Sequence, residues 1–152
     1  MRRGFTVVEM AVVMALILVL AGLAIPRFVK IRQESHLKRA QSELQLISQA
    51  VLQLAWDTGK WPGGISRAVQ GNAELWDLST AKAGLTTFDA ALFKNWMGPY
   101  IDGVPLDPWG SPYFFDPDYT VDGKMQAVVG SFGPNKVGRN LYDKDDIFVV
   151  LK

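Results

Sequence analysis

The chain has 152 residues, of which 49% are hydrophobic, and a formal net charge of +1. That length suits one modest domain with an appendage, and the charge balance argues against a disordered chain or a strongly basic nucleic-acid binder. The sequence contains no Cys and a single His, His36. These counts exclude a disulfide scaffold, a thiolate zinc site and a multi-histidine metal site, and they weaken an enzymatic interpretation.

The hydrophobic residues are concentrated near the start of the chain. From Phe5 to Ile25, only Thr6, Glu9 and Gly22 interrupt an apolar run. A helix of about 20 residues is about 30 Å long, which matches the hydrocarbon thickness of a bilayer. The run is too long for a signal peptide and has no clean Ala-x-Ala cleavage site after it. We therefore expect a membrane anchor, and the basic residues before the run favour a cytoplasmic N-terminus.

Glu9 is the one acidic residue within this run. A carboxylate inside an apolar helix costs about 2.5–3.5 kcal/mol on insertion scales, so it usually has a partner or a function. One explanation is that Glu9 lies near the interface and reaches water. The other is that its partner is an amine, exposed when Phe5 becomes the N-terminus of this or a neighbouring chain. Such a pair would fix the register between identical helices.

The segment Arg2–Met10 resembles the prepilin processing site of the type IV filament superfamily. The resemblance implies that a membrane prepilin peptidase cuts between Gly4 and Phe5 and methylates the new Phe5 amine. It also implies that Glu9 guides subunit assembly. Pro26 matches the position at which the helices of this family kink or melt in the filament.

Beyond Pro26 an amphipathic pattern continues the helix to about Asp57, with Gly59 as its C-cap. The apolar stripe that we expect to pack on the rest of the chain consists of Leu37, Ala40, Leu44, Ile47, Val51 and Leu54. Four segments are therefore predicted: a leader (1–4), a transmembrane and polymerisation helix (5–25), its amphipathic continuation (26–57) and a globular head (58–152).

The charges follow these segments. Most charged residues in the segment 27–39 are basic. From Asp57 onward the sequence contains 12 acidic residues and 9 Lys and Arg, which gives a net charge of −3. The basic stretch has no interleaved aromatic residues, so a nucleic-acid site is not favoured. Lipid headgroups before assembly and neighbouring subunits after it are the partners that its position favours.

The head is predicted to contain three strands, at 113–115, 125–130 and 147–151, and a short helix at 86–96. Asp122 and Gly123 signal a turn, although the connection around them looks too long for a tight hairpin. The expected fold class is α+β: a pilin fold, with one long N-terminal helix packed on a small antiparallel sheet.

Two segments of the head extend the resemblance to the major pseudopilins of type II secretion systems. The first is Leu106–Tyr113, which is similar to the segment that precedes the sheet in that family. The second comprises 131–135 and 142–147, which resemble the family's calcium loop. The ligands that this resemblance implies are Ser131, Asn135, Asp143, Asp145 and Asp146, with Asn135 in a position where Asp is usual. The alternative is an acidic loop that is merely solvated.

A second acidic run, with Asp116, Asp118 and Asp122, superficially follows the EF-hand pattern. The third ligand position, however, is Thr120, and no Glu closes the loop. A plain turn is therefore the preferred interpretation of this run.

The resemblance implies a structural subunit with no catalytic residues, polymerised into the periplasmic pseudopilus that drives type II secretion. Its implied partners are further copies of itself, minor pseudopilins or pilins, the prepilin peptidase and an inner-membrane assembly platform. One alternative is a type IV pilus pilin for adhesion, twitching or DNA uptake, although such pilins often carry a disulfide and this chain has no Cys. Another alternative is a membrane-anchored binding module that never polymerises.

Overall fold

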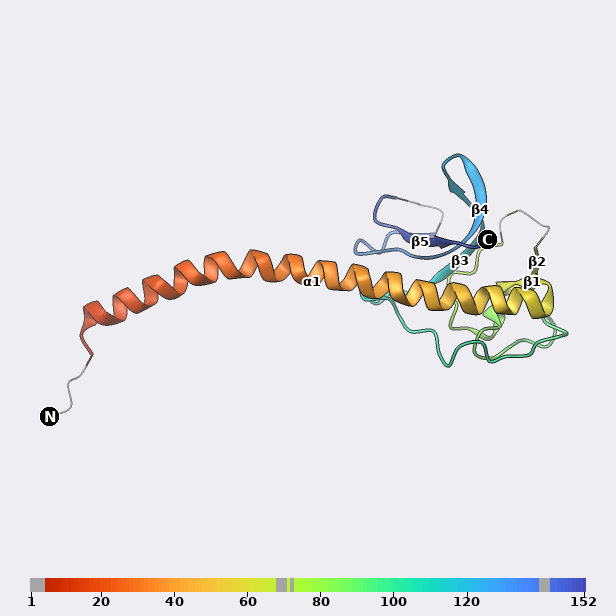
Figure 1. The fold of residues 1–152 in the computed structure, drawn as a ribbon, viewed down its shortest axis with the longest axis horizontal. Helices are drawn as coiled ribbons and strands as arrows, with labels where there is room; N and C mark the ends of the chain where they lie inside the picture. The colour runs from red at the N-terminus through yellow and green to blue at the C-terminus, as the bar shows by residue number, and fades with distance from the viewer. Residues whose placement is uncertain (1–4, 68–70, 72, 140–142) are drawn as a thin grey trace. The chain divides into compact units, whose positions relative to one another are not determined.

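One long helix opens the chain in the computed structural model, which describes residues 5–67, 71, 73–139 and 143–152. Helix α1 spans Val7–Thr58 without interruption and includes Pro26 (Figure 1). After its end, the Gly59 N–H donates to the Ala55 carbonyl over 3.0 Å. Gly59 has a φ of 70°, the left-handed conformation that glycine adopts at little cost. The expected helix end and its glycine cap are therefore confirmed.

The chain divides into two compact units, residues 1–36 and 37–152. Within the first unit nearly all the described side chains are exposed. Within the second unit the apolar stripe of α1 is buried, and five of its members have no exposed surface: Ala40, Leu44, Ile47, Val51 and Leu54. Leu37, at the start of the stripe, remains 39% exposed. The predicted core face of the helix is thus confirmed from Ala40 onward.

The main sheet contains three antiparallel strands in the order β3–β4–β5. Their bounds are β3 Phe114–Val121, β4 Lys124–Ser131 and β5 Ile147–Val150. All three predicted strands therefore exist. In Figure 1 the sheet lies on one side of the second half of α1.

The connection between β3 and β4 differs from the prediction. β3 continues to Val121, which pairs with Lys124 across a two-residue turn, so the hairpin is tight. Asp122 and Gly123 have φ values of 51° and 75°, the combination that a type I′ turn requires. The sequence concealed this extension because Pro117 interrupts the strand, and the register shift between Asp116 and Tyr119 accommodates the proline as a bulge.

Alternation along the strands divides their side chains between two apolar clusters. One cluster joins α1 to the sheet and the loops, through residues such as Ile47, Leu54, Phe115 and Val129. The other lies on the opposite sheet face and is built on Phe114, Tyr119, Val128 and Phe132. An α-helix packed on a small antiparallel sheet is the α+β arrangement that the sequence predicts, and that fold class is confirmed.

The predicted helix at 86–96 is wrong. This segment contains turns and bends. Phe88 stacks on Trp96 with ring centroids 4.4 Å apart, whereas eight residues of helix would separate them by about 12 Å. The Trp96 indole also donates to the Gly84 carbonyl over 2.7 Å, which holds the loop back on itself. Tertiary contacts of two aromatic rings therefore override the local helical signal.

Short elements that the sequence did not reveal occupy the region after α1. β1 (Lys60–Trp61) and β2 (Ile65–Ser66) form a small antiparallel pair around the 3-10 turn η1 (Pro62–Gly64). A second 3-10 turn, η2, spans Ala81–Ala83. The Lys60 ammonium donates to the Leu92 carbonyl over 2.8 Å, which ties the 84–104 loop to the end of the helix.

Candidate functional site

The N-terminal residues form a hydrogen-bonded helix cap. The Thr6 N–H donates to Glu9 Oε2 over 2.8 Å, and the Thr6 hydroxyl donates to the same oxygen over 3.1 Å. In return, the Glu9 N–H donates to Thr6 Oγ1 over 3.2 Å. This is a capping box, in which Thr6 and Glu9 satisfy two backbone donors at the start of a helix. The pattern Thr-x-x-Glu before an apolar run was the sequence signal for it.

The predicted processing residues fall at the edge of the described chain. Gly4 lies outside the described residues, and Phe5 is the first residue described, with 80% of its surface exposed. Cleavage between Gly4 and Phe5 would put the new amine one residue before the capping box. Glu9 would then be the nearest carboxylate along the chain, four residues from that amine.

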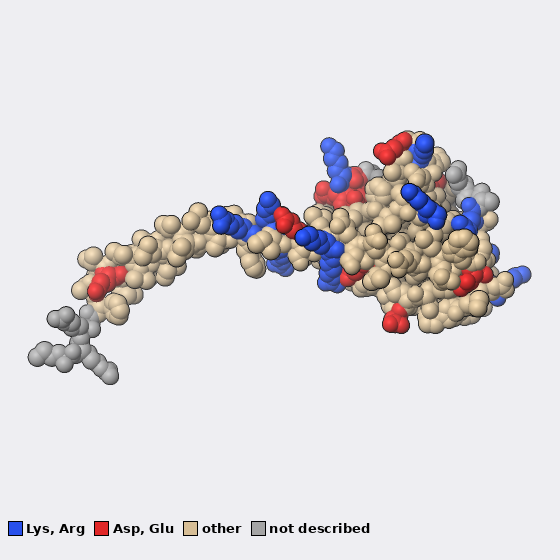
Figure 2. All heavy atoms as spheres, viewed as in Figure 1, with Lys and Arg blue, Asp and Glu red and all other residues tan. Residues whose placement is uncertain are grey.

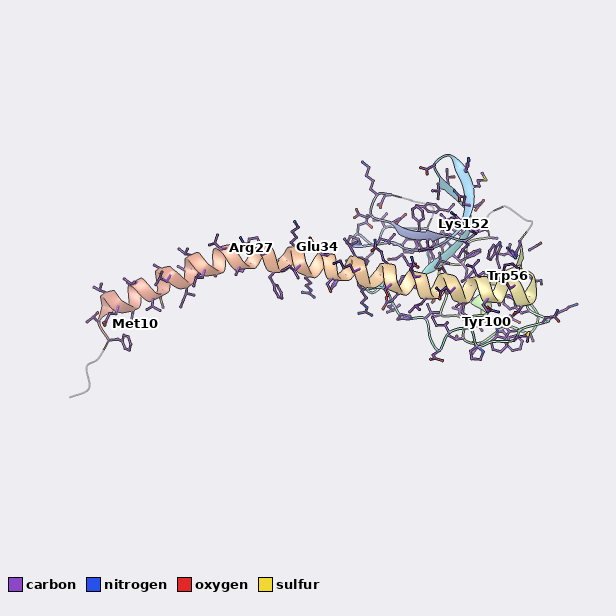
Figure 3. All side chains as sticks on the ribbon, in the orientation of Figure 1. Met10, Arg27, Glu34, Trp56, Tyr100 and Lys152 are labelled. Carbon is purple, nitrogen blue, oxygen red and sulfur yellow. The ribbon has the colours of Figure 1, made fainter. Side chains whose placement is uncertain are left out.

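The surface of α1 in the first unit is apolar. Figure 2 shows an acidic group near the N-terminal end, then a long uncharged surface, then the Lys and Arg residues that begin near Arg27 (Figure 3). The most apolar 18-residue window has a mean hydropathy of 2.7, and none of it is buried. By length and composition, this helix is able to cross a membrane.

Pro26 lies inside α1 with helix assigned on both sides of it. A proline within a helix removes one backbone donor and crowds the preceding turn. A shallow hollow at the same level is lined by residues of the helix itself, including Leu23, Arg27, Phe28 and Ile31. The apolar side chains that line it extend past Pro26 toward the second unit.

The C-terminal loop brings the predicted calcium residues together from its two ends. The Asn135 amide donates to Asp143 Oδ2 over 2.6 Å, and its own oxygen accepts from the Val137 N–H. A Cβ at Gly133 would collide with the carbonyl of Asp145, so the two ends of the loop are in direct contact. Residues 133–135 and 143–145 therefore lie against each other.

Asp146 carries an unsatisfied oxygen in this loop. Its Oδ2 accepts from the Asp143 N–H over 3.2 Å and from the Tyr119 hydroxyl over 3.4 Å. Its Oδ1 is buried and has no hydrogen-bond partner among the described residues. Burial raises the pKa of the Asp146 carboxyl, and the neighbouring Asp143 and Asp145 charges add to the effect. Such an atom is the kind that a bound cation would satisfy.

The Ser131 hydroxyl points instead to a residue that sequence analysis missed. It donates to Asp107 Oδ2 over 2.6 Å and accepts from the Gly133 N–H over 3.1 Å. Asp107 is only 4% exposed, and its Oδ1 accepts from the N–H groups of Trp109 and Ser111. Asp107 therefore locks the 107–111 turn to the loop. Its place within the Leu106–Tyr113 segment was the available signal.

A second group of acids lies elsewhere on the head. Among the described residues, Glu74, Asp116 and Asp118 have carboxylate oxygens within 4.8 Å of one another. The three Asp of the C-terminal loop do not form such a tight group. Asp122 takes no part in the group, because it occupies the β3–β4 turn. Of the EF-hand-like run, only Asp122 lies in a turn, whereas Asp116 and Asp118 belong to β3 and lie together beside Glu74.

Comparison with known proteins covers the helix continuation and the head. The family profile described as "Type II secretion system (T2SS), protein G" matches residues 27–147. The type II secretion system core protein G of Escherichia coli K12 is 30% identical over 112 residues, covering 74% of this chain and 70% of that protein. The proteins of the same name from Klebsiella pneumoniae and Aeromonas hydrophila are 28% and 27% identical over 112 residues, covering 74% of this chain and 72% and 71% of theirs. No solved structure matches the chain.

The family match covers most of the chain and begins within α1, just after its apolar stretch. It is therefore independent of the prepilin-like segment at Arg2–Met10. Both regions support the same assignment. The match also favours a pseudopilin over the type IV pilus pilin that the sequence left as an alternative. The chain belongs to the type II secretion system protein G family, and it is a structural pseudopilin and not an enzyme.

Proposed function

We propose that this pseudopilin is cut between Gly4 and Phe5 and polymerises through α1 into the pseudopilus of a type II secretion system. Before assembly, the helix spans the inner membrane with its N-terminus in the cytoplasm and its head in the periplasm. The filament then pushes folded proteins toward an outer-membrane channel. The chain supplies no catalytic group, and the force comes from a separate motor.

The observation that carries this proposal is the exposed apolar surface of α1 in the first unit. Contiguous apolar patches of this kind mark membrane or protein contacts, because exposure to water is unfavourable. Lipid can cover the surface in the subunit, and the helices of other copies can replace lipid in the filament. Both coverings are apolar, so the exchange changes the hydrophobic free energy little. Packing and polar contacts then decide the assembled state.

Glu9 supplies the polar contact that fixes the register. Its carboxylate sits at the first turn of α1, and the Phe5 amine of a neighbouring copy is the cation it would pair with in an apolar bundle. The capping box lowers the cost of carrying this acid in the unassembled helix, because Thr6 already donates two hydrogen bonds to Oε2.

The proposed partners follow from this sequence of events. The prepilin peptidase cuts and methylates the N-terminus, and an inner-membrane platform adds the subunit to the growing polymer. Other copies of the chain form the body of the filament, and minor pseudopilins join it. No nucleic acid is required.

The test is filament assembly from the full-length chain in a bacterium that supplies the prepilin peptidase and the platform. Wild-type protein is expected to yield shearable filaments by electron microscopy and a mature chain that begins at Phe5 by mass spectrometry. Glu9→Ala is expected to abolish filaments, whereas Glu34→Ala, a matched loss of an exposed acid on the same helix, leaves them intact. Equal assembly by Glu9→Ala contradicts the role proposed for Glu9. Absence of filaments from the wild type, together with a mature chain that keeps residues 1–4, supports the lone membrane-anchored module instead.

We further propose that the C-terminal loop binds Ca²⁺. The donor set suits this ion, because carboxylate, amide and carbonyl oxygens are its preferred ligands. Asp143 and Asp146 would hold the ion, and Asp146 would bind it through its unsatisfied Oδ1. The Asn135 amide and the Asp145 carboxylate would lie beside them. Ser131 would act through its bond to Asp107, or through its remaining oxygen lone pair. The ion would neutralise the crowded carboxylates and fasten the two ends of the loop.

Asn135 makes this site distinctive. Its amide donates to Asp143 and so stabilises that carboxylate by a hydrogen bond. Calcium is expected to displace this hydrogen bond, which lowers the affinity compared with a loop that carries Asp there.

Thermal melting of the detergent-solubilised full-length chain tests the calcium proposal. The midpoint is expected to rise in millimolar Ca²⁺ and fall with chelator, and Asp146→Asn is expected to remove the difference. Asp102→Asn, which changes an exposed acid outside the loop, keeps it. A wild-type melt that is the same with and without chelator contradicts a structural ion.

A further inference from the structure

A small pocket on the head lies outside the features described so far. It is lined by Trp76 and Phe132, whose ring centroids are 6.0 Å apart, and by Pro112. Its volume is about 260 Å³. Pockets for drug-sized ligands run from about 300 to 1,000 Å³, so this one fits a single side chain better than a small molecule.

Every polar side chain that lines the pocket, among the described residues, is a hydrogen-bond donor. The three are Ser111, Lys136 and Arg139, and no Asp or Glu joins them. Ser111 is 9% exposed, and its backbone N–H bonds to Asp107. A hydroxyl and two cations that line one pocket are donors able to accept an anion.

The two cations are held by an uncommon backbone. Lys136 and Arg139 have φ values of 57° and 56°, in the left-handed region that few residues other than glycine adopt. Between them, Gly138 lies so close to Phe132 that a Cβ would overlap the ring. Strain of this kind is unfavourable and persists where the surroundings impose it. The turn thus holds both cations at the rim of the aromatic pocket.

Neither cation is neutralised within the described part of the head. The only ion pair recorded there joins Arg39 to Glu43. The Lys136 ammonium lies instead over Gly110, about 3.9 Å from where a Cβ would stand. Both side chains are exposed, so their charge is available to a partner.

We propose that this pocket takes an acidic side chain from a second copy of the chain, as a contact between the heads of two subunits in the filament. The inference rests on the proposed function, because a homopolymer must carry both halves of each contact on one sequence. Contacts between two different patches of the same subunit also generate open helical filaments. Charge complementarity at such a contact sets partner choice and register.

The complementary half is available on the head. Two acids outside the C-terminal loop are exposed and make no side-chain bond among the described residues, Asp102 and Asp122. Asp122 occupies the tip of the β3–β4 hairpin, and Asp102 lies beside Gly103 in the long loop. A pocket of this size has room for either carboxylate. The Trp76 and Phe132 rings would then cover the residues next to the inserted acid.

Charge reversal tests the contact in the filament assay. Lys136→Glu combined with Arg139→Glu is expected to lower filament yield at least tenfold, while the melting midpoint of the solubilised chain stays within a few degrees of wild type. Lys82→Glu combined with Lys94→Glu makes the same change in net charge at exposed head positions and is expected to assemble normally. Ser111→Ala keeps the backbone bond to Asp107 and is expected to lower the yield to a lesser degree.

Co-expression identifies the occupant. The charge-reversed copy is expected to enter filaments again beside a copy that carries Asp102→Lys or Asp122→Lys, and cross-links should join the two. Unchanged assembly by the charge-reversed chain overturns the proposal. A loss of assembly that neither the Asp102→Lys copy nor the Asp122→Lys copy restores also overturns it, and indicates another ligand for the pocket. Absence of filaments from the wild type refutes the proposed function instead, and that outcome is distinct from both.

Discussion

Thr6 and Glu9 bond to each other three times at the start of α1, through two backbone N–H groups and the Thr6 hydroxyl. The first helical turn therefore begins in a defined place, at Val7, two residues after the proposed N-terminus. A capping residue of this kind contributes about 1 kcal/mol to helix stability in water. In lipid, an unsatisfied N–H costs more, so the cap has more weight there.

Removal of the Thr6 hydroxyl tests the cap. Thr6→Val keeps the shape of the side chain but takes away the acceptor for the Glu9 N–H and one donor to Glu9 Oε2. Amide hydrogen exchange of the full-length chain in detergent micelles is expected to speed up about fivefold or more at residues 7–9. Thr6→Ser restores the hydroxyl and is expected to exchange like wild type, whereas unchanged exchange in the valine variant refutes the cap.

A partly buried hydrogen bond joins α1 to the start of the sheet. The Tyr113 hydroxyl donates to Glu43 Oε2 over 2.6 Å, while Arg39 Nε donates to the other oxygen over 2.9 Å. Tyr113 has no exposed surface. Burial and the Glu43 charge together raise the pKa of the Tyr113 phenol well above its usual range. One carboxylate thus receives a hydrogen bond from the sheet side and one from its own helix.

Loss of this hydroxyl is expected to destabilise the head. Hydrogen bonds to charged groups contribute about 1.5–3 kcal/mol, so Tyr113→Phe should lower the free energy of unfolding by about that much. Arg39→Gln removes an exposed ion-pair partner and should cost less than about 1 kcal/mol. Urea denaturation of the full-length chain measures both, and a reversed order of the two effects contradicts the role of the partly buried bond.

The helical stripe allows a direct test of the core. Ile47 has no exposed surface, whereas its neighbour Leu46 is 58% exposed. Ile47→Ala is expected to cost about 2–5 kcal/mol, because it removes buried methyl groups and leaves a cavity. Leu46→Ala on the next residue should change the free energy of unfolding by less than about 0.5 kcal/mol. Similar losses for the two variants in urea denaturation would show that the helix is rotated from this register.

The contrast between Ile47 and Leu46 also shows what the sequence could determine. A spacing of three and four residues identified the buried face of α1 because helix geometry alone fixes which side chains share a face. The three strands were found for a similar reason, since Val and aromatic residues mark half-buried strands. The local sequence pattern was thus sufficient to predict the elements whose structure depends on local geometry alone.

Elsewhere, contacts between distant residues decided the structure. The 86–96 segment lost its predicted helix to the Phe88–Trp96 stack and to the Trp96 bond with Gly84. β3 extended through Pro117 because β4 supplied the partner for a bulge. The same limit applies to the C-terminal loop, where the calcium ligands stay a prediction and the sequence did not reveal that Ser131 bonds to Asp107. No spacing rule connects residues that meet only after the sheet has formed.

Tyr119 predicts how the head responds to alkaline pH. Burial, followed by the Asp146 charge, raises the pKa of its phenol to about 12, compared with about 10 in an unfolded chain. Between these two values the unfolded state releases a proton that the folded state keeps, so the free energy of unfolding falls as pH rises from about 10 to about 12. A spectrophotometric titration of the folded chain should show the tyrosinate signal of Tyr119 late, and Tyr119→Phe should remove that step. A wild-type titration complete near pH 10 rules out this environment.

Asp107 offers a test of how the 107–111 turn and the C-terminal loop depend on each other. Asp107→Ala leaves the N–H groups of Trp109 and Ser111 and the Ser131 hydroxyl without their acceptor, and each lost partner costs about 1–3 kcal/mol when buried. Ser131→Ala removes one of these donors only, so its effect should be smaller. If the two residues act through their mutual bond, the double variant should be less destabilised than the sum of the single effects, by about 1.5–3 kcal/mol.

A third variant, Asp107→Asn, separates folding from ion binding. Among the proposed calcium ligands, Asp107 hydrogen-bonds to Ser131 alone, so its loss acts on the loop through Ser131 and the Gly133 turn that the Ser131 hydroxyl holds. Asp107→Asn keeps one oxygen for the two N–H groups and should retain most of the stability. Its apparent affinity for Ca²⁺, from melting midpoints across a calcium titration, should nevertheless fall. Full additivity in the cycle, with unchanged calcium dependence in Asp107→Asn, would mean that the turn and the loop fold independently.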